Sequence, residues 1–191
     1  MATKTVDALY FTGDPEERVR LGREPLALLI GFVLDQQVTV QKAFSSPLEL
    51  SRRIGGLDAA QIAGMEPAAL EEAFVAKPAL HRFPGNMAKR VQELCRVIVS
   101  EYGGHAERVW TEATDSADLK RRIEALPGFG DMKVRSLTAV LWKRLGVDMA
   151  KEIAPDHPTL GDVDSPEALE EYQAKKRAYK AAVRAGQPGT W

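Results

Sequence analysis

The feature that most constrains this chain is a tight glycine bend, Leu126-Pro127-Gly128-Phe129-Gly130, between two segments with helical periodicity. Apolar residues repeat at helical spacing on both sides of the bend: Leu119, Ile123 and Leu126 before it, and Val134, Leu137, Leu141 and Leu145 after it. Glycine takes positive φ without steric penalty, so two glycines two residues apart let the chain reverse tightly. The sequence therefore predicts a helical hairpin here.

The start of the second hairpin helix has the features of an anion site. Its first backbone N–H groups lack partners within the helix, and the helix dipole adds to their attraction for negative charge. Lys133 and Arg135 lie within the first turn or so. This combination suits a nucleic-acid phosphate, held without regard to base sequence. Asp131 opposes it, because an acid there stabilises the helix but repels phosphate.

The rest of the chain also reads as helix, so we expect an all-α fold. Residues 26–37 are apolar nearly all round, which predicts a central buried helix. A helix starts after Asp14, and another runs over residues 86–102 until Gly103-Gly104 stops it. Ser116 or Asp115 can cap the helix that enters the hairpin, and Ser165-Pro166-Glu167 starts a charged helix over 165–185. Ser46-Pro47 is expected to begin a short helix through Arg53. Residues 77–85 and 146–164 are expected to be irregular.

Composition limits what the chain can do. With 191 residues and a net charge of −1, it can bury a core, and any DNA contact must use a local cationic patch. The single Cys95 excludes an intramolecular disulfide and a cysteine-ligated zinc or iron–sulfur site, and we expect it to be buried. We see neither a signal peptide nor a long apolar run, so a soluble, cytoplasmic, nucleoid-associated protein is expected.

Three blocks together resemble the helix-hairpin-helix (HhH-GPD) DNA glycosylases, the superfamily of endonuclease III, adenine glycosylase and 3-methyladenine glycosylase. The first block is Leu34-Asp35-Gln36-Gln37-Val38-Thr39, similar to a family helix that ends in one or two glutamines. The second is residues 83–102, with Met87-Ala88-Lys89-Arg90. The third and most specific is the hairpin, residues 126–134. The likeness spans roughly residues 24–160.

The resemblance implies two helical lobes around a cleft, with the hairpin at its mouth. One unit would cover residues 1–191: mainly the first lobe over 24–104, the hairpin-bearing lobe over 105–160, and a C-terminal charged helix over 161–191. It also implies a monomer that binds double-stranded DNA through its backbone and flips a damaged base into the cleft. No membrane, organic cofactor or iron–sulfur cluster is implied, although hairpin carbonyls can hold a monovalent cation in the family.

The resemblance also assigns a catalytic aspartate after the hairpin. Ile153-Ala154-Pro155-Asp156-His157 is similar to the family's stretch, which makes Asp156 the candidate. Asp148 and Asp162 are alternatives. A carboxylate there would stabilise an oxocarbenium-like sugar or deprotonate water.

Some family members carry a lysine nucleophile on the second hairpin helix and cut the strand. Matching the glycines places Met132 at that position, with Lys133 about 100° further round the helix. We therefore expect hydrolysis of the N-glycosidic bond without strand cleavage, and a Lys133 that meets phosphate or solvent. The alternative is a hairpin with one extra residue, which would return Lys133 to the nucleophile position.

The remaining assignments concern DNA contacts. Gln37, or Gln36, would fill the gap left by the flipped base, with capping of the helix end as the alternative. The expected DNA-binding set is Gln36, Gln37, Lys89, Pro127, Gly128, Phe129, Gly130, Lys133 and Arg135. The charged tail reads as a solvated helix or as a basic arm that reaches DNA. Two other functions stay open: an inactive DNA-binding protein of the same fold, and an all-α interaction protein.

Overall fold

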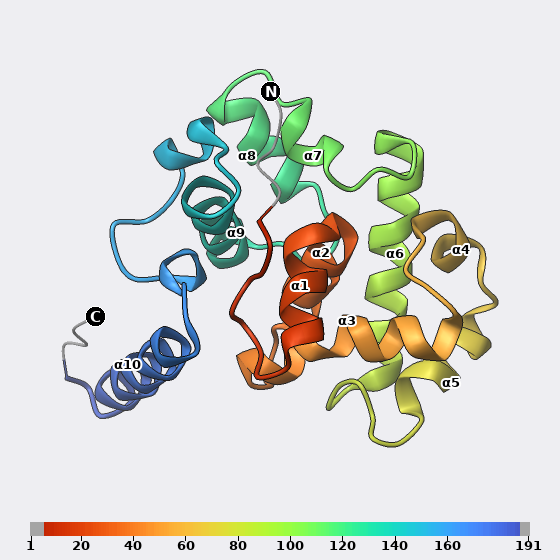
Figure 1. Ribbon diagram of the computed structural model, residues 1–191, viewed down its shortest axis with the longest axis horizontal. Coiled ribbons are helices and arrows are strands. Elements are labelled where there is room, and N and C mark those ends of the chain that lie inside the picture. Colours follow the sequence, from red (N-terminus) through yellow and green to blue (C-terminus); the bar gives the residue numbers. More distant parts are fainter. Residues whose placement is uncertain (1–5, 188–191) are drawn as a thin grey trace.

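The computed structural model describes residues 6–187, and every regular element within that range is a helix (Figure 1). The helices are α1 (Pro15–Arg23), α2 (Pro25–Leu34), α3 (Val40–Ile54), α4 (Ala59–Gly64), α5 (Pro67–Val75), α6 (Pro84–Tyr102), α7 (Arg108–Thr111), α8 (Ser116–Glu124), α9 (Asp131–Lys143), η1 (Asp148–Glu152), η2 (Leu160–Asp162) and α10 (Pro166–Arg184). The all-α prediction is confirmed.

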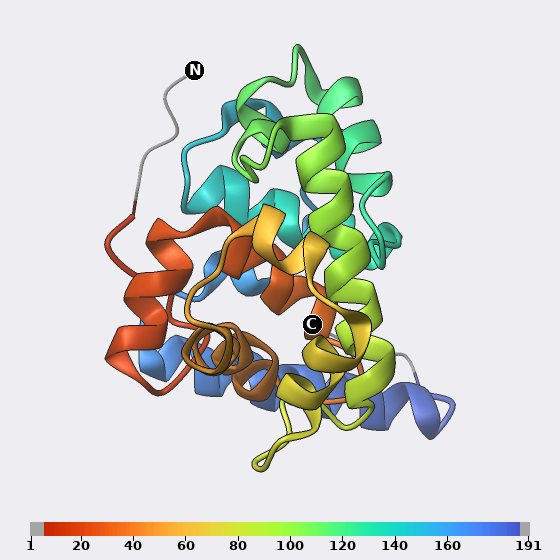
Figure 2. The ribbon, with the colours of Figure 1, turned by 90° about the vertical axis from the view of Figure 1, so that its right-hand side faces the viewer.

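Helix α2 forms the centre of the molecule. Every residue from Leu26 to Leu34 is buried, as the run of apolar residues predicted. Helices α1, α3 and α6 pack around it, and the long α6 also supports α4 and α5 (Figure 2). Cys95 of α6 is fully buried, and burial raises the pKa of its thiol to about 12, so it is unreactive at neutral pH.

Local capping explains where several helices begin and end. Asp14 caps α1, since its carboxylate accepts a 2.7 Å hydrogen bond from the backbone N–H of Glu16. Asp115 caps α8 in the same way through Asp118, at 2.8 Å. Gly103 ends α6 with a left-handed φ of 62°. These capping signals are local, which is why the sequence located them.

The prediction of a short helix that starts at Ser46-Pro47 is wrong. Helix α3 starts six residues earlier, where Thr39 accepts a hydrogen bond from the N–H of Lys42, and it continues through Pro47. Proline removes one backbone donor but does not prevent the helix when packing holds it. Here the hydroxyl of Ser46 lies 2.8 Å from the carbonyl of Leu80, which fixes this part of α3 to the loop before α6.

The second group of helices is built on α9. Helices η1 and η2 lie in the segment expected to be irregular, and both pack against α9. Gly161 approaches α9 so closely that a Cβ would lie 2.5 Å from the carbonyl oxygen of Ala139. Ion pairs of Lys143 with Asp162 and of Arg144 with Asp164 hold the same segment. Helix α9 therefore positions the chain that follows the hairpin.

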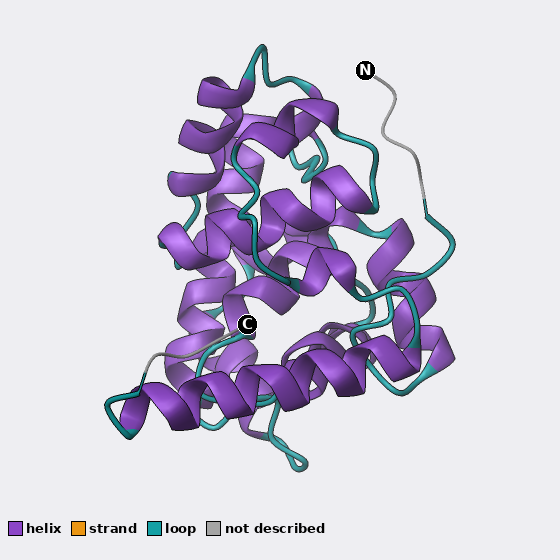
Figure 3. Ribbon diagram, turned by 90° about the vertical axis from the view of Figure 1, so that its left-hand side faces the viewer, coloured by secondary structure: helices purple, strands orange, loops and turns teal. Residues whose placement is uncertain are grey.

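Helix α10 crosses one side of the molecule as a long rod (Figure 3). Ser165 caps its first turn through the N–H of Ala168, as the sequence predicted. Only Leu169 and Tyr172 of this helix are buried. In residues 6–187, no helix is both long enough and apolar enough to span a bilayer.

Candidate functional site

The hairpin joins α8 to α9 as predicted, but only one of its glycines needs to be glycine. Gly128 has a φ of +84°, which other residues rarely adopt. Gly130 has a φ of −89°, and a Cβ there would meet nothing within 4 Å, so the expectation of positive φ at both positions is corrected. Both glycines are exposed.

The predicted anion site is present as backbone geometry. The N–H groups of Lys133 and Val134 both donate to the carbonyl of Gly130. Within the described part of the chain, the N–H groups of Gly130, Asp131 and Met132 donate to no protein acceptor. The start of α9 therefore presents exposed donors to an approaching phosphate.

Two predicted hairpin contacts have other partners. Phe129 is buried, with 6% of its surface exposed, and its ring packs against Phe32 of α2 with centroids 6.3 Å apart. Its side chain is thus an anchor, and only its backbone can face DNA. Arg135 forms an ion pair with Asp131 at 3.0 Å. This pair offsets the negative charge beside the hairpin, so Asp131 is less repulsive to phosphate than the sequence implied.

A groove lies beside the hairpin, which we call the hairpin-side groove. Its lining is largely polar: Gln36, Gln37, His81, Phe83, Asn86, Met87, Lys89, Arg90 and Glu93. Lys89 is exposed there. A Cβ on Gly128 would lie 4.0 Å from the side chain of Arg90, so the groove and the hairpin adjoin.

The two predicted glutamines have different roles. Gln36 caps the end of α2, because its amide donates to the carbonyl of Val33 at 3.0 Å and accepts from Arg90 at 2.9 Å. Its backbone carbonyl is 2.9 Å from the ring of buried His81. Gln37 is exposed and has a φ of +55°, the left-handed region that is unfavourable for residues other than glycine. The capping alternative thus holds for Gln36, whereas Gln37 is presented at the surface.

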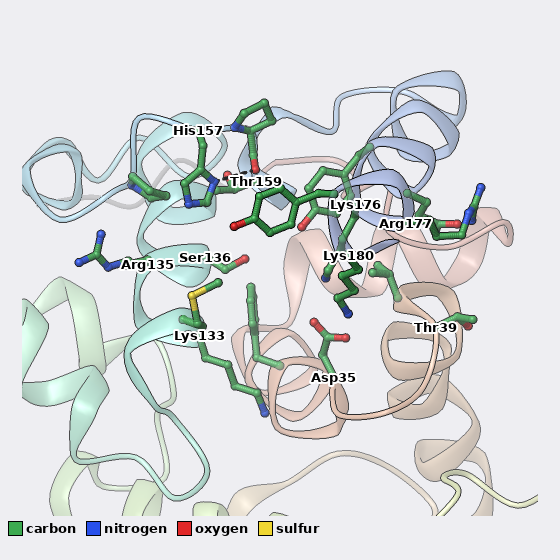
Figure 4. Close-up of a pocket in the computed structure, with 18 of the residues that line it drawn as sticks. Asp35, Thr39, Lys133, Arg135, Ser136, His157, Thr159, Lys176, Arg177 and Lys180 are labelled. Carbon is green, nitrogen blue, oxygen red and sulfur yellow. Dashed lines mark hydrogen bonds between the residues drawn. The ribbon is translucent and has the colours of Figure 1, made fainter. Parts of the chain in front are cut away.

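Gln37 also borders a second hollow, a cavity of about 520 Å³ that we call the cleft cavity (Figure 4). The end of α2, the start of α3, the first turns of α9, residues 155–159 and α10 enclose it. Its walls combine apolar and aromatic side chains with polar and charged ones. Burial raises the pKa of Tyr172 in this wall, so its hydroxyl stays protonated at neutral pH.

Lys133 lies in the cleft cavity, and the expectation that it meets phosphate or solvent is corrected. Its Nζ donates a 3.0 Å hydrogen bond to the carbonyl of Val33. Burial lowers the pKa of Lys133 to about 8, although the negative charge of Asp35 acts in the opposite direction. Met132, at the family's lysine position, also borders the cavity but is 68% exposed.

The cleft cavity contains one carboxylate, and it is not the predicted one. Asp35, at the end of α2, points into the cavity (Figure 4). Asp156 is exposed and does not line the cavity, whereas its neighbour His157 does. Asp148 is also exposed, and Asp162 is engaged by Lys143 and by the backbone of Thr159. The sequence did contain a local signal for Asp35 as a candidate carboxylate, because this charged residue comes directly after a fully apolar helix.

In residues 6–187, no three His, Cys, Asp or Glu side chains gather as a metal-binding group.

The residues expected to contact DNA fall into two groups, those that are accessible at the surface and those that already have partners within the protein. Gly128, Gly130, Lys89 and Gln37 are exposed around the hairpin and the groove, and Pro127 is half-buried. By contrast, Gln36, Phe129, Lys133 and Arg135 have partners within the protein.

Comparison with known families agrees with this arrangement. Residues 30–157 match the model of the HhH-GPD superfamily base excision DNA repair proteins. The match covers most of the chain and includes the second half of α2, all of α6, the hairpin and the segment after it, so the chain belongs to this superfamily, whose members bind DNA. Neither the curated proteins nor the solved structures gave a significant match.

Proposed function

We propose that this protein is a DNA glycosylase that removes a damaged base from double-stranded DNA and acts as a monomer. The observation that carries the proposal is the cleft cavity, which holds one carboxylate and one amine of lowered pKa directly behind the exposed hairpin. The hairpin N–H groups and Lys89 bind backbone phosphates. The damaged base leaves the stack, passes Gln37 and enters the cavity.

In this proposal Asp35, rather than Asp156, assists the cleavage. A carboxylate beside the sugar stabilises positive charge as the bond between C1′ and the base nitrogen breaks. It also accepts the proton of the water whose oxygen then bonds to C1′. Asp35 is in the cavity and Asp156 is outside it, so geometry favours Asp35 for both tasks.

Lys133 supports a second candidate activity, strand cleavage after base release. A lysine with a pKa of about 8 has a sizeable neutral fraction near neutral pH, and a neutral amine is a nucleophile. Attack of Nζ on C1′ would break the bond to the base, which leaves with a proton, and opening of the C1′–O4′ bond would then give an imine with the sugar. Reduction with borohydride would then link the protein covalently to DNA, whereas a purely hydrolytic enzyme would leave no such adduct.

The test is base release from a panel of duplexes that carry uracil, hypoxanthine, alkylated purines or oxidised bases. We expect release from at least one duplex, and a loss of roughly a hundredfold or more in Asp35→Asn. Asp156→Asn is the matched control and should keep its activity. The reverse ranking of the two variants would assign the chemistry to Asp156. Tight duplex binding without release from any duplex would identify an inactive DNA-binding protein.

A further inference from the structure

Helix α10 lies outside the residues that match the family, yet it closes one side of the cleft cavity. Tyr172 packs into the wall with 9% of its surface exposed, and the helix follows directly from η2. Lys176 and Lys180 extend from α10 toward the carboxylate of Asp35 (Figure 4). The cavity of this chain is therefore only partly built by the shared family fold.

Four neighbouring basic residues of α10, at positions 175–180, differ in their surroundings. Lys175 pairs with Glu171 at 2.6 Å and does not line the cavity. Lys176, Arg177 and Lys180 line it, and none of the three has an ion-pair partner in residues 6–187. Lys176 and Lys180 are one helical turn apart, so their charges act on the same region of space.

The cavity as a whole is strongly cationic. Five of its lining residues are Lys or Arg, and Asp35 is its single acidic residue. Arg135 is neutralised by Asp131, which leaves four cationic residues and one acidic residue in the lining. The whole chain has a net charge of −1, so this concentration of positive charge is local. Clustered cations around a hollow attract an anionic ligand.

A second observation on the same helix indicates an absent ligand. Gln173 lines the cavity, and its amide Nε2 is buried without a hydrogen-bond acceptor in the described part of the chain. A buried donor without a partner is costly, and a ligand oxygen can remove that cost. The cationic side chains and the Gln173 amide both point to a ligand that binds on the α10 side of the cavity.

We propose that Lys176 and Lys180, with Arg177, bind a phosphate of the DNA strand that carries the extruded nucleotide. This inference rests on the proposed function and adds a contact from outside the family fold. The hairpin would hold the duplex, while α10 would hold the flipped nucleotide once it has entered the cavity. The α10 contact is therefore made only by DNA whose nucleotide is extruded.

The test is equilibrium binding to a duplex with a tetrahydrofuran abasic-site analogue and to an intact duplex of the same sequence. In the double variant Lys176→Ala, Lys180→Ala, we expect affinity for the abasic duplex to fall roughly tenfold, and its salt slope to fall by about two. Affinity for the intact duplex should change less than twofold. Lys175→Ala, the matched control, should behave as the wild-type protein does.

Three results would overturn the inference: equal losses on both duplexes, a loss in Lys175→Ala as large as in the double variant, or no loss in the double variant. Competition by a free deoxynucleoside monophosphate as strong as that by the abasic duplex would also overturn it, because the site would then be one for free nucleotides. Base release is scored separately. A wild-type protein without release contradicts the proposed function, while the binding comparison still decides the role of α10.

Discussion

The ammonium group of Lys133 donates a 3.0 Å hydrogen bond to the backbone carbonyl of Val33, one hundred residues earlier in the chain. This bond joins the first turn of α9 to the last turn of α2 at the wall of the cleft cavity. The same carbonyl also accepts from the amide of Gln36 at 3.0 Å. The carbonyl of Val33 therefore keeps the Gln36 amide as a donor when the ammonium group is removed. A substitution at Lys133 leaves no backbone acceptor without a hydrogen bond at this point.

The first prediction concerns the pH dependence of stability. The pKa of Lys133 is lowered from 10.5 to about 8, so the unfolded chain binds more protons than the folded chain between these values. The free energy of unfolding of the wild-type protein should then rise with pH across this window, relative to Lys133→Met. We expect a relative gain on the order of 1 kcal/mol, measured by urea unfolding at pH 7.5 and pH 10.

Lys175→Met serves as the control for that experiment, because Lys175 is half exposed and pairs with Glu171 at the surface. Its difference from the wild-type protein should stay nearly constant over the same pH range. A Lys133→Met variant whose curve runs parallel to that of the wild-type protein would show that the amine has an ordinary pKa.

The second prediction concerns the hairpin glycines. Gly128→Val places a β-branched side chain at a φ of +84°, so the hairpin must distort and its N–H groups must move. Binding should weaken equally for duplexes of unrelated sequence, since phosphate contacts carry no sequence information. Fluorescence anisotropy with two such duplexes measures this, and a loss confined to one sequence would contradict it.

Gly130→Ala, at the other hairpin glycine, is the variant to compare with Gly128→Val, and the measured quantity is the stability of the folded protein. A Cβ at Gly130 meets nothing within 4 Å, and its backbone suits any residue. The variant should lose at most about 1 kcal/mol, the usual cost of alanine at a helix N-cap. A larger loss on thermal unfolding would mean that the open space around Gly130 is filled in solution.

The third prediction separates stability from activity at Gln37. Its φ of +55° costs a residue with a Cβ about 1 kcal/mol, so Gln37→Gly should unfold at a higher temperature. If the side chain fills the gap left by the flipped base, the same variant should release base more slowly. Gln37→Gly with full activity would leave the side chain without a role in base flipping.

The fourth prediction tests how the segment after the hairpin is held. Gly161→Ala puts a methyl group 2.5 Å from the carbonyl oxygen of Ala139, and backbone atoms cannot simply move aside. We expect a loss of about 1–3 kcal/mol in the free energy of unfolding. Gly64→Ala, with nothing within 4 Å of the added atom, is the control and should be close to neutral. Equal stability of the two variants would contradict the packing of η2 on α9.

The sequence was sufficient wherever the signal was local. Caps at Asp14 and Ser165, the glycine end of α6 at Gly103 and the apolar run of α2 each act within a few residues. The hairpin belongs to the same class, because a bend of five residues between two apolar stripes has few other solutions. The all-α fold therefore followed from local patterns.

The cavity could not be derived in this way, because its groups come from distant segments. The charges of Asp35 and Lys133 influence one another because the start of α9 is hydrogen-bonded to the end of α2. The helical angle between Met132 and Lys133 does not say which of the two side chains is buried: both border the cavity, but Met132 is largely exposed whereas burial lowers the pKa of Lys133. Likewise, the sequence placed Asp156 near the hairpin and could not show that the loop turns this side chain outward.

The position of α10 has a consequence for how such a protein diversifies. Helix α10 closes one side of the cleft cavity, yet it lies outside the residues that match the superfamily. On the proposed function, substitutions at the exposed positions of α10 that border the cavity can alter which lesion is accepted without disturbing the hairpin or the buried core. On the proposed function, selectivity in this lineage can evolve independently of the scaffold that performs the repair.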